Sequence, residues 1–353
     1  SKIPAWMKVI DNGPGALNSK FQNGTDYDGN MGIKIRGQSS QMFPKKSYSI
    51  ELRSRSGADT TASLLGMPGE EDWVLYAPYS DKTMMRNALT FHLGSELGEW
   101  QPRNSWCEVY LNGNYIGIYQ LMESIKRDSN RVDISKLKPD ELSGDDLTGG
   151  YIIKADKIDY GSSDFFQIFP SVHYQNSDNY RFTYVYPKYD EIAEAQKSYI
   201  KKFITDAENS LNGSSFSDPS KGFRKYMDVN SFVDFQIIQE FVNNVDGYRF
   251  STFFYKDKDS EGGKLHAGPL WDFDLCYGNE DYTDFNLDTD IWLYSKFEDM
   301  YGGRMHWWAR LMEDLSYRGV FVSRWKELRK GAFHTDSLMT YLDNTVEFLG
   351  DAI

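Results

Sequence analysis

The stretch NSFVDFQIIQEFVNN (residues 230–244) constrains the fold most, because apolar residues occupy nearly every face of the helix that it predicts. A helix of this kind has to be buried, so we expect it at the centre of a domain. It ends in a polar turn that contains Asn243, Asn244 and Asp246. A buried carboxylate is costly without a positive partner. The turn therefore predicts a polar site next to the core.

The residues after this turn predict an antiparallel hairpin that leads to two further carboxylates. FSTFFYK (250–256) predicts one strand, DKDSEGGK (257–264) a turn, and the chain then returns toward GPLWDFD (268–274). An antiparallel hairpin brings its outer ends together, so Asp246 and Asp272 should approach each other. Asp274 should share a face with Asp272, because side chains alternate along an extended segment.

Three carboxylates without a nearby His or Cys favour a hard divalent cation such as Mg²⁺ or Mn²⁺. We therefore predict a metal site formed by these aspartates. The competing interpretation is that each aspartate caps a turn or pairs with an arginine. DKDSEGG also resembles the start of a calcium loop, but Gly268 stands where the bidentate glutamate is needed, so a hairpin turn is favoured.

The first third of the chain alternates like a sheet. Strands are predicted at 32–37 and 46–53, a hairpin at 107–122 turns at Asn112-Gly113, and a helix lies within 80–98. The remainder predicts a short strand at 149–156, a polar surface insertion at 157–180, a helix from about 190 to 211, and helices from 290 onward. The predicted fold class is α+β, with a small sheet-rich lobe and a larger, mainly helical lobe.

The charge balance restricts the partners. Lys and Arg number 39 against 52 Asp and Glu, a net charge of 39 − 52 = −13, which argues against nonspecific nucleic-acid binding. A polyanionic ligand would have to arrive with a cation or meet a local basic cluster. No apolar run approaches the length of a membrane span. Cys107 and Cys276 stand among apolar residues and exclude a disulfide framework.

The order of helix, Asp-bearing loop, hairpin and Asp-Phe is the order of a protein-kinase C-lobe. Seven blocks in addition make the sequence resemble the CotH family, the kinase-like spore-coat protein H proteins of bacteria. These blocks are IKIRGQSS, FPKKSYSIEL, DWVLYAPYSDKTMMRNAL, YLNGNYIGIYQLMESIKRDSNRVDI, TGGYIIKADK, NNVDGYRFSTFFYKD and GPLWDFD.

The resemblance implies an atypical protein-kinase-like fold of two lobes. The N-lobe would span 1–125, sheet-rich with one helix, and the mainly helical C-lobe 126–353 with the hairpin. Because the sequence starts at Ser1 and ends within a helical pattern, we expect the native protein to continue. The cofactors implied are ATP and Mg²⁺ or Mn²⁺, and the spore-coat members phosphorylate Ser in coat proteins.

Carried onto this sequence, the resemblance makes Asp246 the catalytic-loop aspartate and Asp272 the metal-binding aspartate. Lys46 would hold the phosphates. Alternation favours it over Lys45, because Lys46 shares a strand face with Tyr48 and the apolar residues that follow.

Further contacts follow from the same resemblance. Arg36 and the loop that begins at Gly37 would cover the phosphates through backbone N–H groups. Met122 and Glu123 would lie nearest to the adenine.

The sequence departs from the kinase pattern at several points. Ser251 stands where a kinase has the asparagine that binds the second metal ion, and Asp274 replaces the glycine of the Asp-Phe-Gly motif. We expect both residues to contribute metal ligands. There is no His-Arg-Asp motif and no Gly-rich phosphate loop. No helix glutamate is obvious, and Asp81 and Arg86 are the candidates for that ion pair.

The predicted function is transfer of phosphate from ATP to Ser or Thr of secreted or surface proteins, possible coat proteins among them, with a glycan hydroxyl as another acceptor. The alternative is a catalytically silent kinase-like module that binds protein or glycan at the bacterial surface. A metal-assisted phosphohydrolase would use the same carboxylates. From the resemblance we expect an exported protein of the cell or spore surface.

Two tryptophans at 307–308 predict core packing, with a carbohydrate platform as the minor interpretation.

Overall fold

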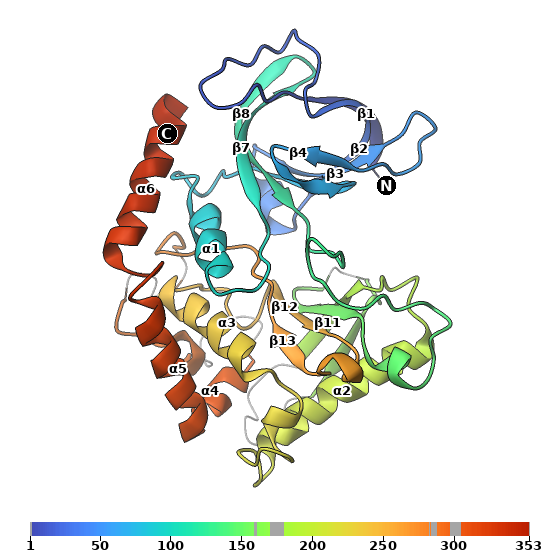
Figure 1. Cartoon of the computed structure of the whole chain (residues 1–353), viewed down its shortest axis with the longest axis vertical. Helices are drawn as coiled ribbons and strands as arrows, with labels where there is room; N and C mark the ends of the chain where they lie inside the picture. The colour runs from blue at the N-terminus through green and yellow to red at the C-terminus, as the bar shows by residue number, and fades with distance from the viewer. Residues whose placement is uncertain are drawn as a thin grey trace. The chain divides into compact units, whose positions relative to one another are not determined.

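The structure is a computed structural model that describes residues 2–158, 161–169, 180–281, 283, 288–296 and 305–352 (Figure 1). The chain forms two compact units. The first unit comprises Ser1–Met84, Pro102–Ile125 and Leu349–Ile353, and the second comprises Met85–Gln101 and Lys126–Phe348. Helices and strands are both abundant, so the predicted mixed α+β class is confirmed.

The first unit is built on a six-stranded sheet in the order β1-β2-β3-β6-β8-β7, in which every neighbouring pair is antiparallel. Its strands are β1 (Ile3–Val9), β2 (Tyr27–Arg36), β3 (Ser47–Arg53), β6 (Asp72–Tyr76), β7 (Asn104–Leu111) and β8 (Asn114–Glu123). A two-stranded sheet joins β4 (Ala62–Leu64) to β5 (Met67–Glu70). The predicted turn between β7 and β8 is confirmed, since Asn112 and Gly113 both adopt positive φ angles, 51° and 81°.

The core of the first unit lies on one face of this sheet. It contains alternate residues of the central strands, among them Ile50, Leu52, Trp73, Leu75, Tyr119 and Leu121. Gln120 and Met122 alternate onto the opposite face of β8 and are also buried. The alternation that predicted these strands therefore also determines which residues build the core.

The second unit contains a five-stranded sheet in the order β10-β11-β9-β12-β13, again with antiparallel neighbours. Its strands are β9 (Tyr151–Ala155), β10 (Phe165–Ile168), β11 (Tyr180–Tyr186), β12 (Thr252–Lys256) and β13 (Leu265–Ala267). The stretch 157–180, expected to be a surface insertion, therefore supplies β10 and the first residue of β11. Residues 159–160 and 170–179 of that stretch lie outside the described residues.

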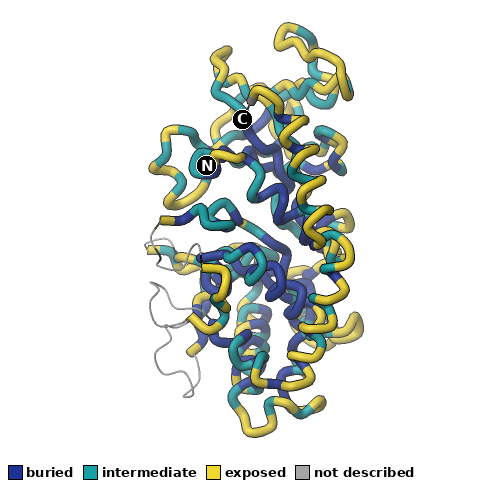
Figure 2. The backbone as a smooth tube through the Cα atoms, turned by 90° about the vertical axis from the view of Figure 1, so that its left-hand side faces the viewer, coloured by how far each residue is buried: buried dark blue, intermediate teal, exposed yellow. Residues whose placement is uncertain are grey.

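The helices of the second unit are α1 (Arg86–Ser95), α2 (Glu194–Asn212), α3 (Val229–Phe241), α4 (Trp307–Leu311), α5 (Leu315–Leu328) and α6 (Thr335–Leu349), whose last residue is grouped with the first unit. α2 contacts β10. α3 contacts β13 (Figure 1). The prediction that α3 is central is confirmed, because every residue from Ser231 to Gln239 is buried. Figure 2 shows how buried and exposed residues are distributed along the chain.

Two features of the second unit bear directly on the predictions. Trp307 and Trp308 are completely buried and stack around Phe232, so the core interpretation is confirmed and the carbohydrate-platform interpretation is wrong.

Helix α1, which the sequence analysis assigned to the first lobe, packs within the second unit. Its His92 stacks on Tyr341 of α6, with ring centroids 4.4 Å apart. No helix in the described ranges is both long and apolar enough to cross a bilayer.

Candidate functional site

The loop after α3 is shaped by a buried asparagine. Asn244 donates from its side chain to Oε1 of Gln239 at 2.7 Å, and its Oδ1 accepts the backbone N–H of Asp246 at 3.1 Å. The preceding residue, Asn243, adopts a left-handed φ of 50°. The polar turn predicted from the sequence is thus fixed to the end of the helix, and it places Asp246 at a defined position.

Asp246 has a buried cationic partner. Arg249 donates from Nη2 to Oδ1 of Asp246 at 2.6 Å, and its side chain is only 4% exposed, against 20% for Asp246. The guanidinium also lies over the ring of Phe250, 4.7 Å from its centroid. The arginine pairing that the sequence analysis held as the competing interpretation is therefore present at this aspartate. It orients the carboxylate and leaves part of it accessible.

Asp272 differs from Asp246, because it is exposed and its backbone is strained. Its φ is 68°, and that of Ser251 is 48°. Residues other than glycine occupy this left-handed region at a cost, and such residues gather at functional sites. Ser251 Oγ lies 3.4 Å from Oδ2 of Asp272. Two residues that the sequence predicted as metal ligands are thus brought together.

The segment that carries Asp272 is attached to helix α1. The N–H of Phe273 donates to Oδ1 of Asn87 at 2.7 Å, and Nε of Arg86 donates to the carbonyl of Cys276 at 3.0 Å. The N–H of Tyr277 donates to the carbonyl of Val242 at 2.8 Å, which ties the same segment to the end of α3. Helix α1 therefore helps to position the predicted metal-binding segment.

The thiol of Cys276 indicates that the three aspartates share one neighbourhood. Its pKa is raised well above the usual value, first by complete burial and then by the negative charges of Asp274, Asp246 and Asp272, while Arg86 opposes the rise. Asp274 accepts a hydrogen bond at its backbone carbonyl from the side chain of Asn279, at 2.7 Å. All three predicted carboxylates therefore act electrostatically on one buried group.

The carboxylates do not converge on a single point. Within the described ranges, no group of three or more His, Cys, Asp or Glu side chains is placed to hold a metal ion. The Ser251–Asp272 pair nevertheless fits Mg²⁺, since two neighbouring oxygen ligands of an octahedral ion at its usual bond length lie about 3 Å apart. Such an ion takes its remaining ligands from water and phosphate oxygens.

The hairpin that connects these residues is confirmed. β12 pairs with β13 through Phe254–Ala267, Tyr255–His266 and Lys256–Leu265. Within the turn, Nζ of the buried Lys256 donates to Oδ1 of Asp259 at 2.9 Å and also to the carbonyls of Thr148 and Asp257. The ammonium of Lys256 therefore takes the place next to the acidic turn. This supports the hairpin turn over the calcium loop.

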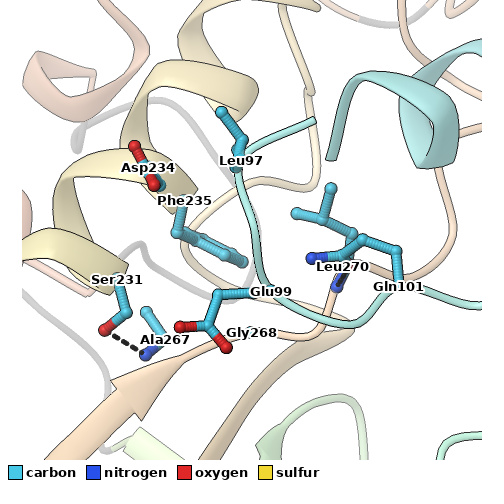
Figure 3. A pocket seen from close by; sticks show the side chains of 9 residues that line it. All are labelled: Leu97, Glu99, Gln101, Ser231, Asp234, Phe235, Ala267, Gly268 and Leu270. Atoms are coloured by element: carbon cyan, nitrogen blue, oxygen red, sulfur yellow. Dashed lines mark hydrogen bonds between the residues drawn. The ribbon is translucent and has the colours of Figure 1, made fainter. Parts of the chain in front are cut away.

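A small pocket beside this hairpin contains none of the predicted site residues (Figure 3). It is lined by Leu97, Glu99, Gln101, Ser231, Asp234, Phe235, Ala267, Gly268 and Leu270. Gln101 accepts the N–H of Leu270 at 2.7 Å, and Ser231 accepts that of Ala267 at 3.2 Å. These bonds attach the chain that leads to Asp272 to α3 and to the 97–101 segment.

In the first unit, the ammonium of Lys46 lies against a loop. Nζ donates to the carbonyls of Gln41 at 2.6 Å and Phe43 at 2.5 Å, and Lys46 itself precedes β3. The neighbouring Lys45 donates to the carbonyl of Ile118 and lies over the ring of Tyr119. Burial lowers the pKa of Lys45, and the charge of Lys82 adds to this effect. The phosphate-holding role of Lys46 stays a prediction.

Arg36 is the last residue of β2, and the predicted phosphate loop begins directly after it. Gly37 has a φ of 97°, and a Cβ at this position would lie 2.0 Å from Oγ of Ser40. Only glycine therefore fits this backbone. Arg36 and Gly37 remain predicted phosphate contacts.

The two residues predicted to lie nearest to the adenine are both buried in β8. The side chain of Glu123 is completely buried and accepts two hydrogen bonds from the guanidinium of Arg103, at 2.8 and 2.7 Å. A third hydrogen bond comes from the N–H of Arg103 at 3.0 Å. This carboxylate joins β8 to the start of β7, while the adenine contacts of Met122 and Glu123 stay predictions.

The candidates for a helix ion pair have partners within their own units. Asp81 is buried and accepts hydrogen bonds from the backbone and hydroxyl of Thr83, at 3.1 and 2.6 Å. Arg86 contacts the carbonyl of Cys276, as described above. These contacts give Asp81 a turn-stabilising role and give Arg86 a role in holding the metal-binding segment.

Two basic residues were not predicted from the sequence, Arg249 beside Asp246 and Lys154 opposite Phe253 of β12. Arg249 follows Asp246 by three residues, so the spacing carried a signal for the ion pair. Lys154 lies on β9, which pairs with β12, and no local pattern predicts that pairing.

Comparison with known proteins gives two findings. The sequence profile of a family described as CotH kinase protein matches residues 33–353. The Inner spore coat protein H of Bacillus subtilis (strain 168) is 24% identical over 278 residues, which are 79% of this chain and 63% of that protein. The chain therefore spans less than two thirds of the length of this curated relative.

Proposed function

Because the chain belongs to the CotH kinase protein family, we propose that it transfers phosphate from ATP, with a divalent metal ion, to Ser or Thr of secreted or surface proteins. The observation that carries the proposal is the Ser251–Asp272 pair, two oxygen ligands 3.4 Å apart on strained backbone in the same unit as Asp246. The kinase-like fold is part of the proposal. The order of α3, Asp246 loop, β12–β13 hairpin and Asp272-Phe273 supports it.

Asp272 and Ser251 would hold Mg²⁺ or Mn²⁺, with Asp274 as a further oxygen donor. The ion would neutralise charge on the phosphates and orient them for in-line displacement. Asp272 is exposed, so its carboxylate can exchange water for phosphate-bound metal. Such a ligand pair also lets the nucleotide approach a chain whose net charge is −13.

Asp246 would orient the acceptor hydroxyl and accept its proton. Its Oδ1 is occupied by Arg249, and the carboxylate keeps 20% exposure. A carboxylate fixed through one oxygen can present the other oxygen in a constant direction. The proton therefore passes from the serine or threonine hydroxyl to Asp246 as the hydroxyl oxygen attacks the terminal phosphoryl group.

The remaining nucleotide contacts are proposed from the family resemblance. Lys46, Arg36 and Gly37 would contact phosphates, and Met122 with Glu123 would contact the adenine. Lys46 now donates to two loop carbonyls, so its ammonium has to exchange these partners for phosphate oxygens.

A second candidate is the catalytically silent module that binds protein or glycan at a surface. Two contacts favour this candidate. Lys46 would have to give up its loop carbonyls to bind phosphate, and Asp246 is already paired with Arg249. The spore-coat name of the relative fits either candidate, and on that basis we propose a coat or surface location.

The test combines binding with transfer. Calorimetric titration with ATP, in Mg²⁺ or in EDTA, should show metal-dependent binding that Asp272→Ala abolishes and Asp246→Asn spares. Labelled phosphate should enter a Ser-containing protein with the parent and not with Asp246→Asn. Asp206→Ala, which removes a partly exposed partner of Lys202 on α2, is the matched control and should behave like the parent.

The outcomes separate the candidates. Binding without incorporation into any of a panel of proteins would favour the silent module. Phosphate release from ATP without an acceptor would identify a phosphohydrolase. Equal ATP–Mg²⁺ binding by the parent and Asp272→Ala would contradict the assignment of the metal ligand.

A further inference from the structure

The register of β9 against β12 places a lysine beside the proposed metal ligands. Lys154 pairs with Phe253, and Ala155 pairs with Thr252. Directly opposed residues of two strands point to the same face, and residues two apart on one strand share a face. Lys154 therefore shares a face of the sheet with Phe253, and its neighbour Ala155 pairs with Thr252, the residue that directly follows Ser251.

Lys154 is held in place by two contacts. Its Nζ lies 2.6 Å from Oδ2 of Asp156 and 5.8 Å from the ring centroid of Phe253. The second oxygen of Asp156, Oδ1, accepts the backbone N–H of Lys157 at 2.8 Å, so this carboxylate is itself fixed. An ammonium has three N–H donors. After Asp156 and the ring face each take one, a donor remains for a ligand, and the side chain is 32% exposed.

The backbone of Lys154 lies near that of Ser251. Directly opposed residues of an antiparallel pair have Cα atoms about 4.5–5.5 Å apart, and Lys154 and Ser251 are each one residue away from the opposed pair Ala155–Thr252. Ser251 Oγ is in turn 3.4 Å from Asp272. A lysine side chain extends about 6 Å, so a phosphate bound next to Ser251 and Asp272 is accessible to its ammonium.

Other cations border the same loop. Lys157 Nζ lies 4.6 Å from the ring centroid of Phe250, and Arg249 covers that ring as well. In a chain of net charge −13, Lys157 adds a second positive charge beside this loop, whereas the guanidinium of Arg249 is buried against Asp246. A phosphate needs such a local cation to approach an acidic protein.

We propose that Lys154, oriented by Asp156 and Phe253, is a phosphate-binding residue of this site and contacts the polyphosphate chain of the bound nucleotide. The inference rests on the proposed function. It adds to that function a cation from the second unit itself, independent of Lys46. Asp156 is the positioning residue.

The chain offers a matched control for a purely structural role. Lys197 on α2 has the same two kinds of contact, with Glu194 at 2.8 Å and with the ring of Tyr189 at 4.0 Å. It belongs to the same unit, and α2 carries none of the proposed site residues. Replacing either lysine by methionine keeps the aliphatic stem and removes one partly exposed ion pair, so both variants should fold.

The experiment measures binding of ATP and of inorganic tripolyphosphate, each with Mg²⁺, to the parent, Lys154→Met, Lys154→Arg and Lys197→Met. Loss of a charge-assisted contact should weaken both ligands about tenfold to a hundredfold in Lys154→Met. Lys154→Arg should recover most of the affinity, and Lys197→Met should match the parent. Adenosine should bind all four proteins alike, because it has no phosphate.

The two proposals fail in different ways. If the parent binds ATP–Mg²⁺ and Lys154→Met binds it equally well, the role of Lys154 is refuted and the proposed function stands. If the parent binds neither ATP nor tripolyphosphate with Mg²⁺, both proposals are refuted. Equal weakening by Lys154→Met and Lys197→Met would show a structural effect and would also refute the role of Lys154.

Discussion

The predicted nucleotide-contacting residues of the first unit and the predicted acidic residues of the second unit occupy opposite kinds of environment. Glu123 is completely buried and bonded to Arg103, and Lys46 donates to loop carbonyls. Asp272, by contrast, is exposed, its φ is 68°, and Oγ of Ser251 lies 3.4 Å from its Oδ2. The contacts of Glu123 and Lys46 stabilise the fold, whereas Asp272 occupies a backbone conformation that stability alone would not favour.

This difference teaches that a charged residue in a matching motif can serve structure or chemistry, and that its surroundings distinguish the two. The buried carboxylate of Glu123 accepts three hydrogen bonds from Arg103, which stabilise the fold. The exposed carboxylate of Asp272 on strained backbone is accessible to a ligand from solvent. Substitutions should therefore separate stability from ligand binding in the two regions.

The largest effect is expected at Glu123. Glu123→Gln removes the charge from a completely buried side chain and should lower the free energy of unfolding by about 3 kcal/mol. Urea unfolding measures this loss. At a temperature where the variant is folded, calorimetric titration with ATP–Mg²⁺ tests the proposed adenine contact of Glu123 separately from its role in stability. A Glu123→Gln variant with the stability of the parent but without ATP–Mg²⁺ affinity would show that Glu123 serves ligand binding rather than the fold.

The next effect concerns Asp272. Asp272→Gly removes the carboxylate and relieves the left-handed backbone, so ATP–Mg²⁺ affinity should fall roughly a hundredfold or more. The free energy of unfolding should stay the same or rise by up to about 1 kcal/mol. Calorimetric titration and urea unfolding measure the two quantities. A large loss of stability would show that Asp272 has a structural role like that of Glu123.

Asp314 provides a structural carboxylate in the second unit for comparison. Burial raises its pKa, but hydrogen bonds from Arg224, Ser217 and the N–H of Tyr317 outweigh this and lower the pKa to about 2. Because the folded pKa lies below the unfolded one, the stabilisation is present above about pH 4 and is lost as the pH falls toward 2. It amounts to about 2 kcal/mol.

Asp314→Asn should therefore reduce the free energy of unfolding at pH 6, and the difference from the parent should shrink steadily below pH 4. Urea unfolding across this range measures it. A difference that does not change with pH would contradict the ionic origin of the stabilisation.

The smallest effect is expected at Lys46. Lys46→Met removes hydrogen bonds to the carbonyls of Gln41 and Phe43 and should cost about 1 kcal/mol of stability. The ATP affinity of Lys46→Met decides whether Lys46 has only a structural role. Affinity equal to that of the parent would leave Lys46 as a structural residue, whereas a loss above tenfold would support its proposed role with phosphate.

Local features were predictable from the sequence because short-range physics determines them. The apolar positions of α3 fixed its burial, Asn112-Gly113 fixed a two-residue turn, and alternation identified β12 and its return strand. The approach of Asp246 to Asp272 that the hairpin predicts stays a prediction, whereas Ser251 Oγ lies 3.4 Å from Oδ2 of Asp272. The resemblance named Ser251 and Asp272 as metal ligands.

Long-range features were not predictable in the same way. The pairing of β9 with β12 joins residues about a hundred positions apart, and nothing in either strand specifies the other. Helix α1 has an apolar face that suits any partner, so its membership of the second unit could not be read from its pattern. The contacts of Lys46 depend on the fold of the preceding loop, which alternation does not address.

The most direct test of the account is calorimetric titration of ATP into the parent and into Asp272→Gly, each in Mg²⁺ and in EDTA. We expect the parent to bind only in Mg²⁺ and the variant to bind in neither condition while remaining as stable as the parent. Binding by the parent that is unchanged in EDTA, or binding by the variant that matches the parent, would contradict the claim that Asp272 and Ser251 hold the metal that anchors the nucleotide.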